Sequence, residues 1–400
     1  MTMTTKDGAG TPGEPQPDEP RAGRLGAYWA GVTAVVGMEM RQRMRSRGWY
    51  VMLAIWFVII ALVTWLTWWS WSSQSSFQAG GPDGNHAGPG SLIFEIVMAF
   101  VLLFGLLVAP AFSANAVNGD RAAGTLAIMQ VTLLRPGQIL WGKFLASWIA
   151  GLAFLVVSTP FLLFGILQGG LGAGHILVAL LMLAIELGVV CALGVGISAL
   201  ANRPLFSIVV TYLVVAALSV GTLIAFGLGA MVSHGTVMAN QTFYKGGYSA
   251  ITPEDLGPDG QAARPTPPAG ITDQNADYAC YGPLREYQSV RTDRVAWILA
   301  MNPFVVVADS IPYSPRPGSD YSPTGAFETI SQGARVAQAG PAATYPCADG
   351  KVTPAYLTPK TPLWPLGLGL QLLLAGGVLA LGWRALRTPA GKLPKGTRVA

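Results

Sequence analysis

Long apolar runs, separated by short polar connections, are the main pattern along this chain. Each of six runs is long enough for the roughly 20 residues that a helix needs to cross the hydrocarbon core of a bilayer. Their only acidic side chains are those of Glu95 and Glu186. The pattern therefore predicts an all-α integral membrane protein with six transmembrane helices. Helices 1–5 are expected within residues 49–232, at 49–71, 92–112, 144–167, 175–200 and 205–232. Helix 6 is expected at residues 363–383.

The composition supports this interpretation and excludes a soluble domain. Hydrophobic residues make up 52% of the chain and charged residues 11%, and the mean hydropathy is +0.45. Soluble domains carry about 25% charged residues. The net charge is +5, but the basic residues flank the spans, where they orient helices rather than bind nucleic acid. We therefore expect a multi-pass protein of the cell membrane (plasma or inner) without a nucleic-acid partner.

The two ends of the chain are both expected in the cytoplasm. Residues 384–400 follow the last span and are basic without any acid, and such segments stay on the cytoplasmic side. Six crossings return the chain to the side where it began. Residues 1–27 are rich in Gly and Pro and lack periodicity, so they are expected to form a disordered tail.

Residues 28–48 are expected to form an amphipathic connecting helix in the membrane interface. Apolar residues recur there every four positions, the spacing of one helical face, and Glu39, Arg41 and Arg45 lie among them. Arginines at the membrane face extend toward lipid phosphates. Membrane lipid is therefore an expected partner.

Residues 233–362 are polar and rich in Pro and Gly, and they are predicted to form a long irregular extracytoplasmic loop between helices 5 and 6. The most apolar stretch, residues 295–307, is about thirteen residues long, so it is expected to be interfacial or re-entrant rather than a seventh span. Cys280 and Cys347 are expected to form a disulfide in this oxidising compartment. Cys191, inside the fourth span, is interpreted as core packing.

The connection between the second and third spans, residues 113–143, is the most distinctive polar segment. A short amphipathic helix flanked by charges at the membrane face is suited to docking a soluble partner. In order, the connection contains Asp120-Arg121, Gly124-Thr125-Leu126, an apolar helix-compatible stretch over residues 126–134, the helix-breaking Arg135-Pro136-Gly137, and Gly142-Lys143.

These residues resemble the cytoplasmic loop of type-2 ABC transporter permeases. That loop typically reads E-R-x-x-G-T-L, followed by a Leu-rich helix, a turn, and a Gly-Lys pair before the third span. Asp120 stands where Glu is usual, and Leu133 follows Thr132 where Pro is usual. The carboxylate and the neighbouring base are both retained. The resemblance covers residues 31–206 and the last span.

The resemblance implies the permease subunit of an ABC exporter, a transport component that is not itself an enzyme. ATP and Mg would be bound by a separate cytoplasmic ABC ATPase subunit, with no cofactor bound directly by this chain. The sequence indeed lacks the G-x-x-x-x-G-K-[ST] cradle for nucleotide phosphates. A second permease copy, identical or related, would complete a dimer. The residues expected to couple to the ATPase are Asp120, Arg121, Gly124, Thr125 and Leu126.

Two carboxylates within spans are candidates for a translocation path. A carboxylate inside a membrane is costly and usually faces the bundle interior or a watery cavity. Glu186 lies near the middle of the fourth span and Glu95 near the outer end of the second. Alternatively, Glu186 bonds to a neighbouring helix. The alternative for Glu95 is a solvated position.

Two other classes of function stay open at this stage. One is a stand-alone secondary carrier that uses Glu186 for proton coupling, although no clear internal repeat is visible. The other is a membrane-anchored sensor whose outer segment, residues 233–362, binds a ligand or partner. The three histidines, His86, His175 and His234, are interpreted as scattered surface residues, so no metal site is expected.

Overall fold

The computed structural model describes residues 21–78, 90–125, 135–168, 173–244, 269–274, 278–312, 325–345, 347–352 and 362–387. Several predictions concern other residues and lie outside this part of the chain. They are most of the N-terminal tail, Leu126 with the rest of the amphipathic stretch 126–134, and most of the basic tail 384–400.

The described residues contain six helices that are long and apolar enough to cross a membrane, which confirms the predicted number. Each segment is helical, so its backbone groups are hydrogen-bonded within the segment. Each is also nearly uncharged, so its side chains are compatible with lipid. The six are α2 (Arg47–Gln78), α3 (Gly90–Ser113) continued by the short α4 (Ala116–Ala122), α6 (Pro136–Leu167), α7 (Ala173–Leu200), the fifth span, and α14 (Trp364–Arg387). The fifth span consists of α8 (Pro204–Ala216), a π-helical turn η1 (Ala217–Gly221) and α9 (Thr222–Val232).

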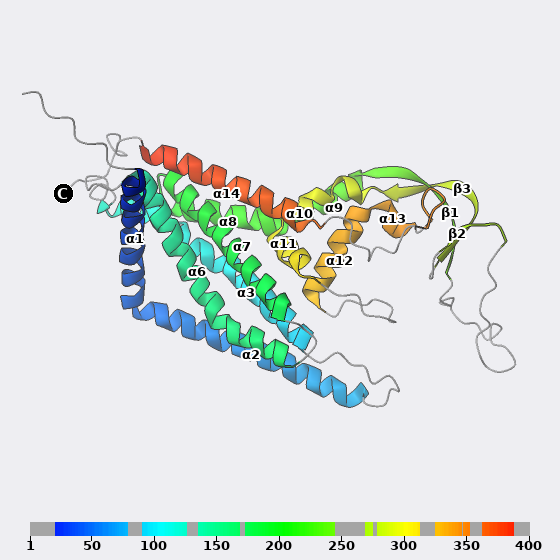
Figure 1. Cartoon of the computed structure of the whole chain (residues 1–400), viewed down its shortest axis with the longest axis horizontal. Coiled ribbons are helices and arrows are strands. Elements are labelled where there is room, and N and C mark those ends of the chain that lie inside the picture. The colour runs from blue at the N-terminus through cyan, green and yellow to red at the C-terminus, as the bar shows by residue number, and fades with distance from the viewer. Residues whose placement is uncertain are drawn as a thin grey trace, which may run out of the picture.

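Helix α7 is the centre of the bundle (Figure 1). In its most apolar 18-residue stretch, 67% of the residues are buried, against 22% in the corresponding stretches of α2 and of the fifth span. It packs against α3, α6 and α14, and the largest apolar cluster includes Leu183 and Leu187 of α7 with Met98 of α3 and Leu162 of α6. The peripheral helices therefore present apolar surface outward.

Helix α1 (Arg21–Arg45) runs across one end of the spans, and we call that end the α1 end (Figure 1). Helix α14 finishes beside it. Val32 and Val35 are fully buried, and the helix packs mainly against α6. A helix is therefore present where the amphipathic connecting helix was expected, and its position in the membrane interface stays a prediction.

The segment between the fifth and sixth spans is a folded module at the opposite end, which we call the sheet end (Figure 1). The antiparallel strands β1 (His234–Tyr244), β3 (Tyr278–Val290) and β2 (Ile271–Gln274) form a sheet in that order. Helices α10 (Ala296–Ala300), α11 (Pro303–Ser310), α12 (Ala326–Ala339) and α13 (Pro341–Thr344) follow. The irregular loop predicted here must therefore be corrected. Its strands are hidden from sequence analysis by frequent Gly and Pro and by incomplete burial.

The module also contains the most apolar stretch of this segment and a disulfide. Residues 295–307 form α10 and α11, broken at Asn302-Pro303, and Val306 and Val307 are fully buried, so the stretch enters the bundle without crossing it. Cys280 of β3 is joined by a disulfide to Cys347, the pairing expected from their shared compartment.

Candidate coupling site

A buried lysine joins three elements at the α1 end. Lys143 of α6 is 1% exposed, and its Nζ lies 2.7 Å from Glu39 Oε1 of α1 and 2.5 Å from Asp120 Oδ2 of α4. A buried ammonium group is stable only when its charge is paired and its donors are satisfied. The two carboxylates meet that need, so α1, α4 and α6 share one ion network.

The glycine before this lysine sets how closely α1 approaches α6. A Cβ on Gly142 would come within 2.6 Å of the Val35 side chain and 3.3 Å of the Val32 carbonyl oxygen. Only glycine leaves enough room for the backbone of α1 there. The Gly-Lys pair therefore has two parts, one that admits α1 and one that binds it.

Arg121 fixes α4 to the end of the central helix α7. Its guanidinium donates to the carbonyl of Ala201 at 2.6 Å and to that of Ala199 at 3.4 Å. These carbonyls lie at the C-terminal end of α7, where backbone acceptors lack helical partners and a cation is favourable. The neighbouring residues Asp120 and Arg121 thus bind two different helices.

Helix α7 in turn caps the start of α4. The backbone N–H groups of Val117 and Asn118, in the first turn of α4, each donate to Ser198 Oγ at 3.1 Å. Ser198 therefore caps α4 from a distant part of the chain. Since Arg121 caps α7 in return, the two helix ends satisfy each other.

Gly124 ends α4. Its φ is +74°, in the left-handed region where glycine has no steric cost. Thr125 Oγ1 donates to the Asp120 carbonyl at 3.2 Å, closing the turn. Among the coupling residues predicted from sequence, Asp120, Arg121, Gly124 and Thr125 are thus brought together, while Leu126 lies outside the described residues.

The arginines of α1 divide between its two faces. Arg41 and Arg45, predicted to contact lipid, are exposed. Arg43, which was not singled out, has its guanidinium 4.9 Å from the centre of the Phe112 ring and donates to the Phe112 carbonyl at 3.4 Å. Burial lowers the pKa of Arg43 from its ordinary value, and nearby Glu39 opposes that change. Its spacing four residues after Glu39 was the signal that could have placed it on the buried face.

The stretch Gly137-x-x-x-x-Gly142-Lys143 matches most of a phosphate-binding loop but has a different role. It lies within helix α6, and Gly137, Gly142 and Lys143 are buried. Phe144 stands where that loop has Ser or Thr. Its backbone N–H groups are used by the helix and its lysine by Glu39 and Asp120, so it is not arranged to hold nucleotide.

The two candidate path carboxylates lie apart from this site and from each other. Glu186 is 1% exposed in the middle of α7. Glu95 lies near the start of α3, toward the sheet end, and is 3% exposed rather than solvated. Its Oε2 accepts from the N–H groups of Phe327 at 2.8 Å and Glu328 at 3.3 Å, in the first turn of α12. The solvated position considered for Glu95 is thus corrected, because the folded module covers it.

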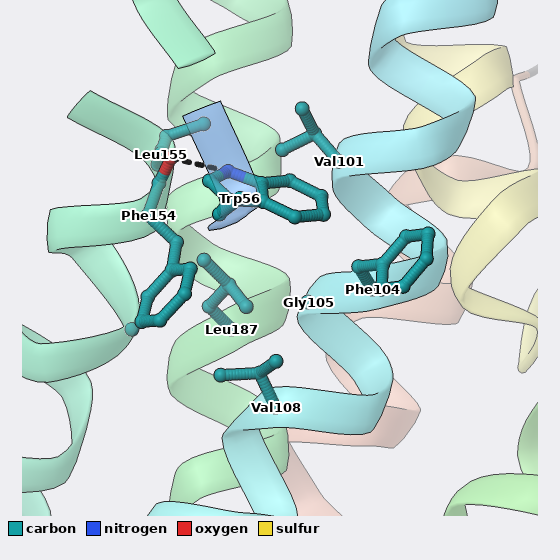
Figure 2. A pocket seen from close by; sticks show the side chains of 9 residues that line it. Trp56, Val101, Phe104, Gly105, Val108, Phe154, Leu155 and Leu187 are labelled. Atoms are coloured by element: carbon teal, nitrogen blue, oxygen red, sulfur yellow. Dashed lines mark hydrogen bonds between the residues drawn. The ribbon is translucent and has the colours of Figure 1, made fainter. Parts of the chain in front are cut away.

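A cavity between α2, α3, α6 and α7 is too small to carry a substrate (Figure 2). Its volume is about 10 Å³, and apolar residues such as Val101, Phe104 and Leu187 line it. Trp56 Nε1 beside it donates to the Phe154 carbonyl at 3.2 Å. A space of this size holds about one water molecule. It provides no substrate path through the described part of one chain.

Comparison with known proteins agrees with these features. A family model described as ABC-2 family transporter protein matches residues 33–313, from α1 to the end of α11. No curated protein matches the chain. The matched region covers most of the chain and includes the second half of α1, the Asp120–Lys143 segment and five of the six spans. The chain therefore belongs to the ABC-2 transporter family and is a membrane-spanning permease of ABC-type transport.

Proposed function

We propose that this chain is the permease subunit of an ATP-driven exporter, and that a separate ATP-binding subunit docks at the α1 end. The single observation that carries the proposal is the Lys143 network. A buried lysine between Glu39 and Asp120 makes α1, the segment after the second span and the third span move together. A force applied to any one of them is transmitted to the other two.

The network also indicates how docking would act on the spans. Arg121 binds the end of α7, which is the most buried helix of the bundle. Asp120 and Arg121, which make these contacts, lie a few residues before the proposed docking segment in the chain. A partner that pushes on residues 126–134 would therefore displace a segment fixed to both α6 and α7, and such rigid-body displacement is a common route to alternating access.

A second permease copy is part of the proposal. The described cavity is too small for a substrate, so the path would lie between two copies. The fifth span supports this arrangement, since it exposes a row of large apolar side chains that lipid or a second copy can cover. They are Leu205, Val209, Leu213, Val220, Leu223 and Leu228. Both termini would lie in the cytoplasm, with the sheet end outside.

Co-purification of an ABC ATPase subunit with this chain from membranes of its native host tests the proposal. The full chain is solubilised in mild detergent as wild type, as Asp120→Ala/Arg121→Ala/Thr125→Ala, and as Arg203→Ala. Arg203 is an exposed arginine in the turn before α8, so it controls for the loss of one positive charge. Bound ATPase should be recovered with the wild type and with Arg203→Ala, and strongly reduced with the triple variant. Absence of ATPase from the wild-type sample would refute the permease–ATPase complex.

ATPase activity separates docking from coupling. Lys143→Met removes the cation that joins the three elements but changes no exposed residue. We expect this variant to retain the ATPase subunit and to lose stimulation of its activity by the permease. Unchanged stimulation would show that the Lys143 network does not transmit the coupling.

A further inference from the structure

A chain of buried polar groups crosses the apolar bundle from the fourth span to the fifth, apart from the coupling site. It begins at Glu186 of α7 and continues with Gln371 of α14 and Asn302 between α10 and α11, which are at most 1% exposed. The helices around them are almost entirely apolar. Buried polar groups in such surroundings are expected to be fully hydrogen-bonded.

The orientation of the Gln371 amide follows from one of its bonds. Gln371 Nε2 donates to the Met301 carbonyl at 3.1 Å, so its Oε1 points away from that carbonyl, and the side chain lies beside the Glu186 carboxyl. Among the described residues, Gln371 Oε1 and both Glu186 oxygens have no hydrogen-bond partner. The contact between α7 and α14 at these two residues, which we call the α7–α14 seam, thus contains three acceptor oxygens and lacks a donor.

One proton supplies the missing donor. A charged Glu186 would leave a carboxylate in an apolar bundle beside an acceptor, with no cation bonded to it among the described ion pairs, and that arrangement is costly. A neutral carboxyl has an O–H that can donate to Gln371 Oε1. We propose that the α7–α14 seam is a proton-binding site in which the neutral acid of Glu186 donates to Gln371.

The same chain extends to the irregular turn of the fifth span. Asn302 follows Met301, and its Nδ2 donates to the Ser219 carbonyl at 2.6 Å and to Thr222 Oγ1 at 2.9 Å. Ser219 lies in the π-helical turn η1, and Thr222 follows it. π-Helical turns are rare and are often found at functional sites. The bound proton therefore holds, through Gln371 and the Met301–Asn302 peptide, the turn that divides the fifth span.

This inference does not depend on the ATPase partner, since it concerns residues remote from the coupling site. In this scheme, a neutral Glu186 is hydrogen-bonded to a neighbouring helix. A carboxylate that lines an open path would instead need water around it. Glu186 and Gln371 are positioning residues for η1 in this scheme.

Infrared spectroscopy of the full chain in lipid bilayers tests the proton. Glu186→Gln replaces the acid by an amide of nearly the same size that can still donate to Gln371 Oε1. The wild-type minus variant difference spectrum at neutral pH should contain the C=O band of one neutral carboxyl group. A difference that contains only carboxylate bands would overturn the proposal.

Hydrogen exchange tests the link to the fifth span. We expect Glu186→Leu and Gln371→Leu to raise amide exchange at Ala217–Thr222 about fivefold to tenfold, the effect of losing one buried hydrogen bond. Glu186→Gln should stay near the wild type. Leu386→Ala is the matched control, because Leu386 of α14 packs with Val195 and Ala199 of α7 in an apolar cluster that contains no residue of η1. Equal exchange in the wild type and both leucine variants, or an equal rise in Leu386→Ala, would show that the chain does not hold the turn.

Discussion

The two ends of the bundle are fastened by different chemistry. At the α1 end, Lys143 lies between the carboxylates of Glu39 and Asp120, and each group belongs to a different helix. At the sheet end, two buried carboxylates bind backbone N–H groups. Glu95 accepts from the first turn of α12, and Asp309 of α11 accepts from the N–H groups of Leu363 and Trp364 at the start of α14, at 2.7 and 3.1 Å.

This difference determines how each end can respond to change. An ion network depends on all three side chains, so the loss of one leaves the others uncompensated. A carboxylate at a helix N-terminus binds groups that every residue except proline provides, and it also complements the helix dipole. The α1 end is therefore sensitive to the identity of its partners. The backbone contacts of the sheet end are sensitive to the two carboxylates alone.

The largest effect is expected at Asp309. Its side chain is fully buried and also accepts from Arg335 Nε at 3.0 Å and Ser331 Oγ at 3.3 Å. Asp309→Ala would leave a partly buried arginine and two N–H groups of α14 without their acceptor, lowering the free energy of unfolding by about 3–5 kcal/mol. Denaturant unfolding in detergent micelles measures this. Asp293→Ala, at a more exposed pair with Arg291, is the control, and an equal loss in both variants would contradict the assignment.

Lys143→Met is expected to have the next largest effect on stability. The two carboxylates that remain are partly exposed, at 17% and 26%, so water relieves part of the cost and we expect a loss of about 2–3 kcal/mol. Limited proteolysis at α1, together with unfolding, would report it. Neutralising all three groups in Glu39→Gln/Asp120→Asn/Lys143→Met should recover part of the loss. A triple variant that is less stable than the single one would argue against the network.

Glu95→Ala should remove the cap of α12 at a smaller cost. Loss of a helix cap costs about 0.5–2 kcal/mol. Amide exchange at Phe327 and Glu328 should therefore rise about tenfold, which corresponds to about 1.4 kcal/mol. Glu95→Gln keeps an acceptor oxygen and should lie between the wild type and Glu95→Ala. Unchanged exchange at both amides would show that the cap does not hold α12.

The smallest effect is a pH dependence at the sheet end. The hydrogen bond from Arg291 lowers the pKa of Asp293 below its ordinary value of 3.8. A carboxylate whose pKa is lower in the folded state stabilises the fold above its unfolded pKa, and this stabilisation is lost as the pH falls from about 3.8 through the folded value. Melting temperatures of the wild type and Asp293→Asn should thus differ at neutral pH and converge in acid. A constant difference would exclude this linkage.

Sequence reasoning anticipated the α1 end much better than the sheet end. The order Asp120-Arg121, Gly124-Thr125 and Gly142-Lys143 is local and recognisable, and the structure shows that each position has a steric or electrostatic reason. The motif still did not reveal that Asp120 binds Lys143 while Arg121 binds the end of α7. Glu95 appeared to be a solvated or path residue, because its partners at Phe327 and Glu328 lie more than two hundred residues away in the chain.

The sequence by itself determined that the chain spans a membrane six times, and the family match supports the type of permease. Span number depends on the length and apolar character of each run, because transfer into a bilayer is a property of the segment itself. Only the tertiary structure decided which groups meet: Lys143 with two carboxylates, Asp309 with the start of α14, and Glu186 with Gln371. Such pairings depend on distances between remote segments, which local composition does not contain. The folded module at the sheet end is the clearest case, because its strands pair with one another and its helices pack against the spans, and these contacts give regular structure to a segment whose own composition predicted none.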